Sequence, residues 1–116
     1  MHTTTTFDWV ENYPAAVSVC DTQGLIIAMN RLAMDNFSKQ GGEALIGTSL
    51  FACHPEPANG IIRNLLQERT GNTYFTEKNG VRKLVHQAPW YHEGRFAGLT
   101  ETIIALPDQV PTKQRS

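Results

Sequence analysis

Two short turns constrain the fold of this chain more than any other feature. Gln23-Gly24 and Asn79-Gly80 each separate two runs that are rich in β-branched and aromatic residues. An Asn-Gly dipeptide favours the type I′ turn that connects hairpin strands, because both central residues of that turn take a positive φ. We therefore expect a β-hairpin near each end of the chain, formed by the runs 15–22 and 25–30 and by the runs 72–78 and 81–91.

The stretch between the two hairpins is expected to be helical. Asn30 offers an N-cap to a short helix over 31–37, and a glycine divides 43–51 into separate helical turns. A longer helix is predicted over 56–69, where the apolar residues fall on one stripe and Gly71 follows as a left-handed cap.

A third β-rich run completes the expected sheet. Residues 95–106 follow a turn at 92–94. Two hairpin-connected blocks on either side of a helical stretch indicate an α+β fold, in which short helices and one longer helix pack on one face of a five-stranded antiparallel sheet. A further short helix is predicted over 7–13, capped by Asp8 and ended before Pro14.

The length of the chain suits one domain. A chain of 116 residues buries roughly two thirds of the surface that its unfolded form exposes, which is enough for one packed core. We expect a single domain over 7–106, with a flexible N-terminus over 1–6 and a flexible tail over 107–116. Cys20 and Cys53 are too few for a disulfide framework, and both thiols are expected to be reduced.

Composition limits the partners that the chain can have. Hydrophobic residues make up 41% of the chain, charged residues 18%, and the net charge is −1, which gives no electrostatic reason to expect nucleic acid or an anionic membrane. No apolar run approaches the roughly 20 residues that span a bilayer, and the first residues lack the features of a secretory signal. We therefore expect a cytoplasmic protein whose partner is a small molecule or another protein.

Four short motifs follow one another along the chain: Cys20-Asp21-Thr22-Gln23-Gly24-Leu25-Ile26 leading to Asn30, Leu45-Ile46-Gly47, His54-Pro55-Glu56, and Gly94-Arg95-Phe96-Ala97-Gly98. In their order and spacing they resemble the PAS domain family, across about residues 7–106. The resemblance implies a sheet of strand order 2-1-5-4-3, with the helical segment cupped over one face and a cavity between them. Members of the family sense small molecules, light or redox state through that cavity, or bind protein partners.

The chain departs from the family pattern at its last strand. Many PAS domains end in an Asp-Ile-Thr motif that couples this strand to an output helix, whereas the matching stretch here is Ala105-Leu106-Pro107. Proline disfavours a continuing helix, and we expect no effector domain after this strand. We therefore expect any output to pass through a partner chain or a dimer surface.

No cofactor is assigned from these residues. Flavin photoreceptors within the family place a reactive cysteine three positions after the glycine that matches Gly47; this chain has Leu50 there, and Cys53 comes three residues later. Haem is held in some members by a histidine on or near the long helix, which makes His54 the haem candidate. Haem and non-covalent flavin stay open as alternatives, whereas a metal site lacks the converging ligands that it needs.

The strand over 81–91 contains the histidine with the strongest claim to a functional role. By the period of two, His86 shares a face with Leu84, Ala88 and Trp90, and this face is the more apolar one. We therefore expect His86 to point into the cavity, either as a ligand-reading imidazole or as a core histidine satisfied by backbone or water. The candidate pocket residues are Ile26, Met34, Phe37, Phe51, His54, Tyr74, His86 and Trp90.

The first functional hypothesis is a non-enzymatic sensory or interaction module in signal transduction. It would bind a small ligand in the cavity, associate with a protein partner, or form a homodimer. The outer face of the sheet supports association, because alternation of Val17, Val19, Ile27 and Met29 predicts an apolar outer face that needs a cover. That cover is expected from Phe7 and Trp9 on the N-terminal segment or from a second copy of the chain.

The second hypothesis is a small α+β cone-type isomerase or cyclase. Such an enzyme uses a His or Asp base in an apolar pocket, and here the base would be His86 acting with Glu101 or Asp35. Folds of that kind begin with a long helix, whereas this chain begins its core with a β-hairpin.

Overall fold

The structure, a computed structural model, describes residues 7–53 and 56–116 of the chain. Strands lie at both ends of this region, and short helices lie between them. In chain order the elements are β1 (Ala16–Cys20), β2 (Ile26–Met29), α1 (Arg31–Asn36), η1 (Ser38–Gln40), η2 (Gly42–Leu45), α2 (Leu50–Cys53), α3 (Ala58–Glu68), β3 (Asn72–Lys78), β4 (Val81–His92) and β5 (Arg95–Ala105). None of the helices in this described part combines the length and apolar content that a bilayer crossing requires.

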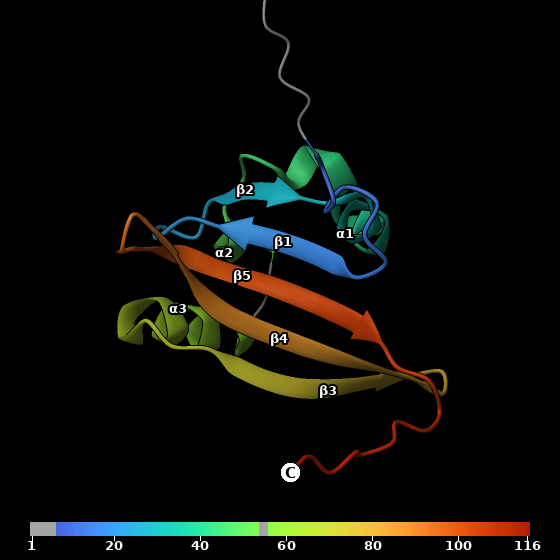
Figure 1. Cartoon of the computed structure of the whole chain (residues 1–116). Helices are drawn as coiled ribbons and strands as arrows, with labels where there is room; N and C mark the ends of the chain where they lie inside the picture. The colour runs from blue at the N-terminus through green and yellow to red at the C-terminus, as the bar shows by residue number, and fades with distance from the viewer. Residues whose placement is uncertain (1–6, 54–55) are drawn as a thin grey trace, which may run out of the picture.

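The five strands form one antiparallel sheet of order β2-β1-β5-β4-β3. Figure 1 shows the long β4 and β5 side by side at its centre, with α2 and α3 behind the sheet in this view. The first and last strands along the chain are neighbours, so the two hairpin blocks join through the β1–β5 pair. The α+β architecture and the strand order expected from the sequence are confirmed.

Both predicted hairpins form, and their turns show why. In the first, the Asp21 carboxylate accepts hydrogen bonds from the main-chain N–H groups of Gln23 and Leu25, at 2.9 Å each. In the second, Asn79 and Gly80 have φ values of 52° and 78°, as the type I′ turn requires. Asn and Gly tolerate this left-handed region better than other residues, so the dipeptide selects the turn.

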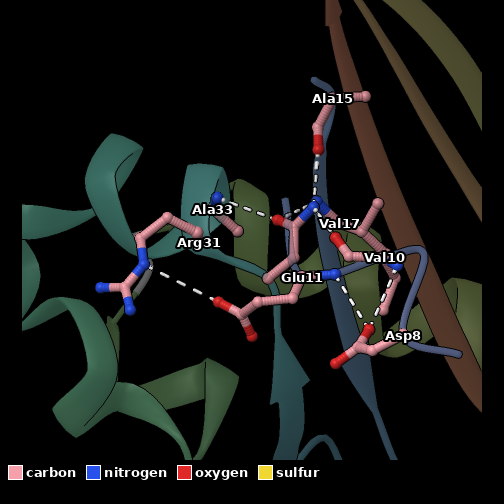
Figure 2. A network of polar contacts seen from close by, with 8 residues as sticks. Asp8, Val10, Glu11, Ala15, Val17, Arg31 and Ala33 are labelled. Carbon is pink, nitrogen blue, oxygen red and sulfur yellow. Dashed lines mark hydrogen bonds and ion pairs between the residues drawn. The ribbon is translucent and has the colours of Figure 1, made fainter. Parts of the chain in front are cut away.

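Asn30 joins three segments of the fold through one buried side chain. Its amide Nδ2 donates to the carbonyl oxygens of Val10 (3.0 Å) and Ala15 (2.8 Å). Its Oδ1 accepts from the main-chain N–H groups of Val17 (2.9 Å) and Ala33 (3.1 Å). Figure 2 shows these partners converging from the N-terminal segment, β1 and α1. The predicted N-cap of the first helix is therefore confirmed, and the same residue also fixes the N-terminal segment.

The helix predicted over 7–13 does not form. The Asp8 carboxylate instead closes a single turn by accepting from the N–H groups of Val10 and Glu11, at 3.2 and 3.1 Å. The segment is too short before its proline for helix propagation to offset the cost of nucleation. Trp9 and Phe7 remain 61% and 86% exposed, so they do not provide the expected cover for the sheet.

The longer helix starts later and ends differently from the prediction. It begins at Ala58, two residues after Glu56, whose carboxylate accepts from the N–H of Gly60 at 3.1 Å. The left-handed cap is Arg69, with φ 55° and ψ 48°, and not Gly71. At position 71 a Cβ would collide with the carbonyl oxygen of Gln87, so glycine is needed there for close approach to β4.

A β-bulge changes which residues of β2 face the helices. The register shifts between Val19 and Cys20, so that Met29 pairs with Ser18 and is buried at 8% exposure. The prediction that Met29 lies on the outer face is therefore wrong. A bulge inserts one extra residue, here Ile27, and reverses the alternation beyond it.

Candidate functional site

A cavity of about 270 Å³ lies between the sheet and the helices. Its wall is formed by η1, η2, α2, α3, the residue that follows α1, and four of the strands. The lining residues are Ser18, Val19, Cys20, Ile26, Met29, Phe37, Gln40, Leu45, Leu50, Ile62, Gln87, Leu99, Thr100 and Glu101. Gln40 is solvent-exposed although it lines the cavity, so the cavity reaches solvent beside η1.

The cavity lies between two clusters of the hydrophobic core. Its walls are apolar because residues of both clusters line it. One cluster gathers Ile26, Met29 and Leu45 under α1 and η2, and the other gathers Ile62 and Leu99 between α3 and β5. Leu50 packs against both clusters from α2. Such a mostly apolar enclosure with few polar groups is the common form of a small-molecule site.

The polar part of the cavity comes from the sheet. Gln87 of β4 and Glu101 of β5 are cross-strand partners, and the Gln87 Nε2 donates to Glu101 Oε2 at 2.7 Å. Gln87 is only 9% exposed. So short a bond is expected when an amide donates to an ionised carboxylate. The sheet therefore presents a fixed amide and carboxylate to an otherwise apolar space.

The pair belongs to a row of four polar residues that crosses the sheet. In strand order the row comprises Ser18, Glu101, Gln87 and Asn72, each opposite the next on the neighbouring strand. We call this set the polar row. The Oδ1 of Asn72 is buried without a hydrogen-bond partner.

Burial sets the protonation of the other ionisable groups on this face. It raises the pKa of the Cys20 thiol, a shift that the charges of Asp21 and Glu101 reinforce and that a hydrogen bond from Leu99 opposes. Desolvation also raises the pKa of Tyr74, with a smaller contribution from the charge of Glu101. Cys20 is a free, buried thiol that stays protonated at neutral pH, which disfavours a role as a nucleophile.

The structure brings only part of the predicted pocket together. Ile26 and Phe37 line the cavity. Met34 packs against the first core cluster and Phe51 against the second, outside the cavity lining. Tyr74 lies 43% exposed on the peripheral strand β3.

The predicted placement of His86 and Trp90 is wrong, because β4 turns its other face to the helices. His86 is exposed, and its Nδ1 lies 2.8 Å from the Thr73 hydroxyl on the outer face. Trp90 also lies on that face, where its Nε1 donates to the carbonyl oxygen of Cys20 at 3.0 Å. The inward residues of β4 include Gln87, which hydrophobicity alone assigns to solvent.

Gln87 and Glu101 are the residues that sequence reasoning missed as ligand-site residues. The signal that identifies them is cross-strand pairing, which requires the register of β4 with β5. Counting residue pairs back from the turn at 92–94 assigns the wrong cross-strand partner to Gln87, because a bulge opposite Trp90 and Tyr91 shifts the register of β4 with β5 by one residue.

The arrangement required by the isomerase hypothesis does not form. Gln87, and not His86, is the cross-strand partner of Glu101, so His86 and Glu101 face opposite sides of the sheet. Asp35 is exposed on α1 and does not line the cavity. The three proposed base residues therefore cannot act on one substrate in this cavity.

The described residues also fit haem poorly. His86 and His92 are both exposed and outside the cavity lining, so neither offers an axial imidazole there. Within the described ranges, no cluster of three or more His, Cys, Asp or Glu side chains could hold a metal ion. The haem candidate His54 lies outside the described residues.

No protein-family model and no curated protein sequence matches the chain. Solved structures do match. The PAS domain of BvgS from Bordetella pertussis shares 18% identity at a TM-score of 0.65, covering 84% of this chain and 81% of that one. A sensory box sensor histidine kinase from Vibrio cholerae shares 14% identity at a TM-score of 0.61, covering 84% and 86%.

The Aer2 receptor of Vibrio cholerae, described as a dual PAS-heme oxygen sensor, shares 16% identity at a TM-score of 0.60. The match covers 80% of this chain and 95% of that one. These likenesses agree with the strand order of the sheet. The chain folds as a PAS domain.

Proposed function

We propose that the chain is a non-catalytic sensory module in signal transduction, which binds a small organic ligand in the cavity beneath the sheet. One observation carries the proposal: an apolar cavity of about 270 Å³ contains a fixed, partly buried polar pair, Gln87 and Glu101. Apolar walls supply affinity by burial, and a few placed polar groups supply orientation and specificity. The volume is at the low end for ligand pockets, so the ligand is smaller than a typical drug molecule.

The similar structures support a sensory role. The Aer2 receptor of Vibrio cholerae is described as an oxygen sensor, and the sensory box protein of the same organism as a sensor histidine kinase. In this chain the cavity separates two core clusters that share Leu50, so a ligand that fills it would tie α2 and α3 more firmly to the sheet. The signal would then be a change in the packing of these helices, read by a partner.

Association with a partner chain or a second copy is the other part of the proposal. Ile27, Phe75 and Ile104 are 42%, 57% and 38% exposed on strands of the sheet. Exposed apolar surface of this kind is typical of interaction sites. Light scattering over a range of concentrations would test it: a monomer at every concentration would contradict a homodimer.

Ser18→Leu tests the ligand site directly. The substitution adds bulk to a small residue that lines the cavity, so it is expected to abolish binding of fragments detected by ¹H–¹⁵N chemical-shift changes. Ala28→Leu is the matched control, because Ala28 is exposed on the paired strand β2. Unchanged fragment binding in a folded Ser18→Leu variant would contradict the cavity as the site.

A further inference from the structure

The polar row offers acceptors that the protein itself leaves unsatisfied. Glu101 receives one hydrogen bond at Oε2 from Gln87, while a carboxylate has about four lone-pair sites in two oxygens. The Oδ1 of Asn72, two strands away, is buried with no partner. Asn72 does not line the cavity, so the acceptor of the polar row that a ligand in the cavity can reach is the Glu101 carboxylate.

The charge of Glu101 is also uncompensated within the described residues. The three ion pairs that these residues form involve Glu11, Glu56 and Glu93, and none involves Glu101. A carboxylate beside apolar walls attracts a cation or a polarised N–H group more strongly than it would in water. A second carboxylate in the same space would be repelled.

The neighbouring groups do not change this balance. Cys20 and Tyr74 are the other ionisable side chains whose surroundings include the Glu101 charge, and burial keeps both of them protonated and neutral at pH 7. Ser18, opposite Glu101, is neutral. The local field at the polar row is therefore set by one carboxylate.

We propose that the cavity selects small, largely apolar molecules that carry an N–H donor, such as an amidine, an amine or a primary amide, and rejects carboxylates. The donor would bind Glu101, oriented by Gln87, and the apolar body would lie against Ile62 and Leu99. This inference rests on the proposed function, because it specifies the ligand of the same cavity.

Four probes of nearly the same shape test the inference. Benzamidine carries a cationic donor, benzamide a neutral donor, acetophenone no donor and benzoate a negative charge. Binding of each to the full chain is measured by ¹H–¹⁵N chemical-shift titration, with the shifts mapped onto the cavity. Benzamidine and benzamide are expected to bind about tenfold more tightly than acetophenone, since a hydrogen bond to a charged group is of that order. Benzoate is expected to be the weakest.

Glu101→Gln separates the charge from the shape of the site. It should remove most of the preference for benzamidine and strengthen benzoate binding relative to the wild type. Glu77→Gln is the control, because Glu77 is exposed on β3 and does not line the cavity. If all four probes bind equally within the cavity, the donor preference is overturned and the ligand site stands. If none of them shifts cavity amides, both proposals are overturned.

Discussion

Replacing Asn30 by alanine tests the account of how the N-terminal half is assembled. The substitution removes four side-chain hydrogen bonds and leaves two N–H groups and two carbonyl oxygens, all buried or partly buried, without their partner. At about 1 kcal/mol net for each bond, the expected loss is about 4 kcal/mol. That loss is a large part of the roughly 5–15 kcal/mol by which a domain is stable.

Urea unfolding followed by circular dichroism measures this loss, with the midpoint falling and the m-value unchanged. Asn36→Ala is the matched control, because Asn36 is an exposed asparagine in the helix that Asn30 caps, and its replacement should leave the free energy of unfolding within about 0.5 kcal/mol. Asn30→Ser should fall between the two, since serine can still cap α1. A loss below about 1 kcal/mol for Asn30→Ala would refute the central role of this side chain.

Three further substitutions test the sheet and its two faces. Gly98→Ala should destabilise the fold by more than about 2 kcal/mol, because Gly98 has a φ of +141° and a Cβ there would collide with the carbonyl oxygen of Cys20. The control Gly60→Ala in α3 should not destabilise it in this way. Equal unfolding midpoints for the two variants would contradict the prediction. Burial raises the pKa of the Cys20 thiol above its ordinary 9.0, so the thiol ionises at a lower pH in the unfolded chain than in the folded one. The free energy of unfolding should therefore fall as the pH rises above about 9. The Cys20→Ala variant should lose less stability than the wild type between pH 8 and 10. His86→Ala should leave fragment binding unchanged, because His86 lies on the outer face of the sheet beside Thr73. Loss of fragment binding in this variant would show that His86 belongs to the ligand site.

The elements were predictable where local chemistry decides them. Asn79-Gly80 fixes the turn between β3 and β4, and β3 occupies the expected residues 72–78. The turn at Asp21 and the bond by which Asn30 caps α1 likewise join atoms that are two to four residues apart. Local hydrogen bonds and φ preferences are encoded within a short window, so the order of elements and the fold class follow from the sequence.

Which face of each strand points to the helices was less predictable, and several candidate site residues were therefore assigned to the wrong face. The bulge in the β1–β2 pair shifts the alternation along β2 by one residue and places Met29 inward, and β4 turns the face that carries Gln87, not the one that carries His86, to the helices. Gln87 is polar, and so a hydrophobicity pattern places it in solvent although it is buried against Glu101. Long-range pairing decides these positions, and a single sequence does not show it.

The most direct test of the account is a crystal structure of the chain with benzamidine. The amidinium should lie within hydrogen-bond distance of Glu101, with the benzamidine ring between Ile62 and Leu99 and the Gln87 amide still bonded to the carboxylate. Benzamidine bound only on the outer face of the sheet, or an empty cavity at saturating concentration, would contradict the claim that this cavity is a ligand site.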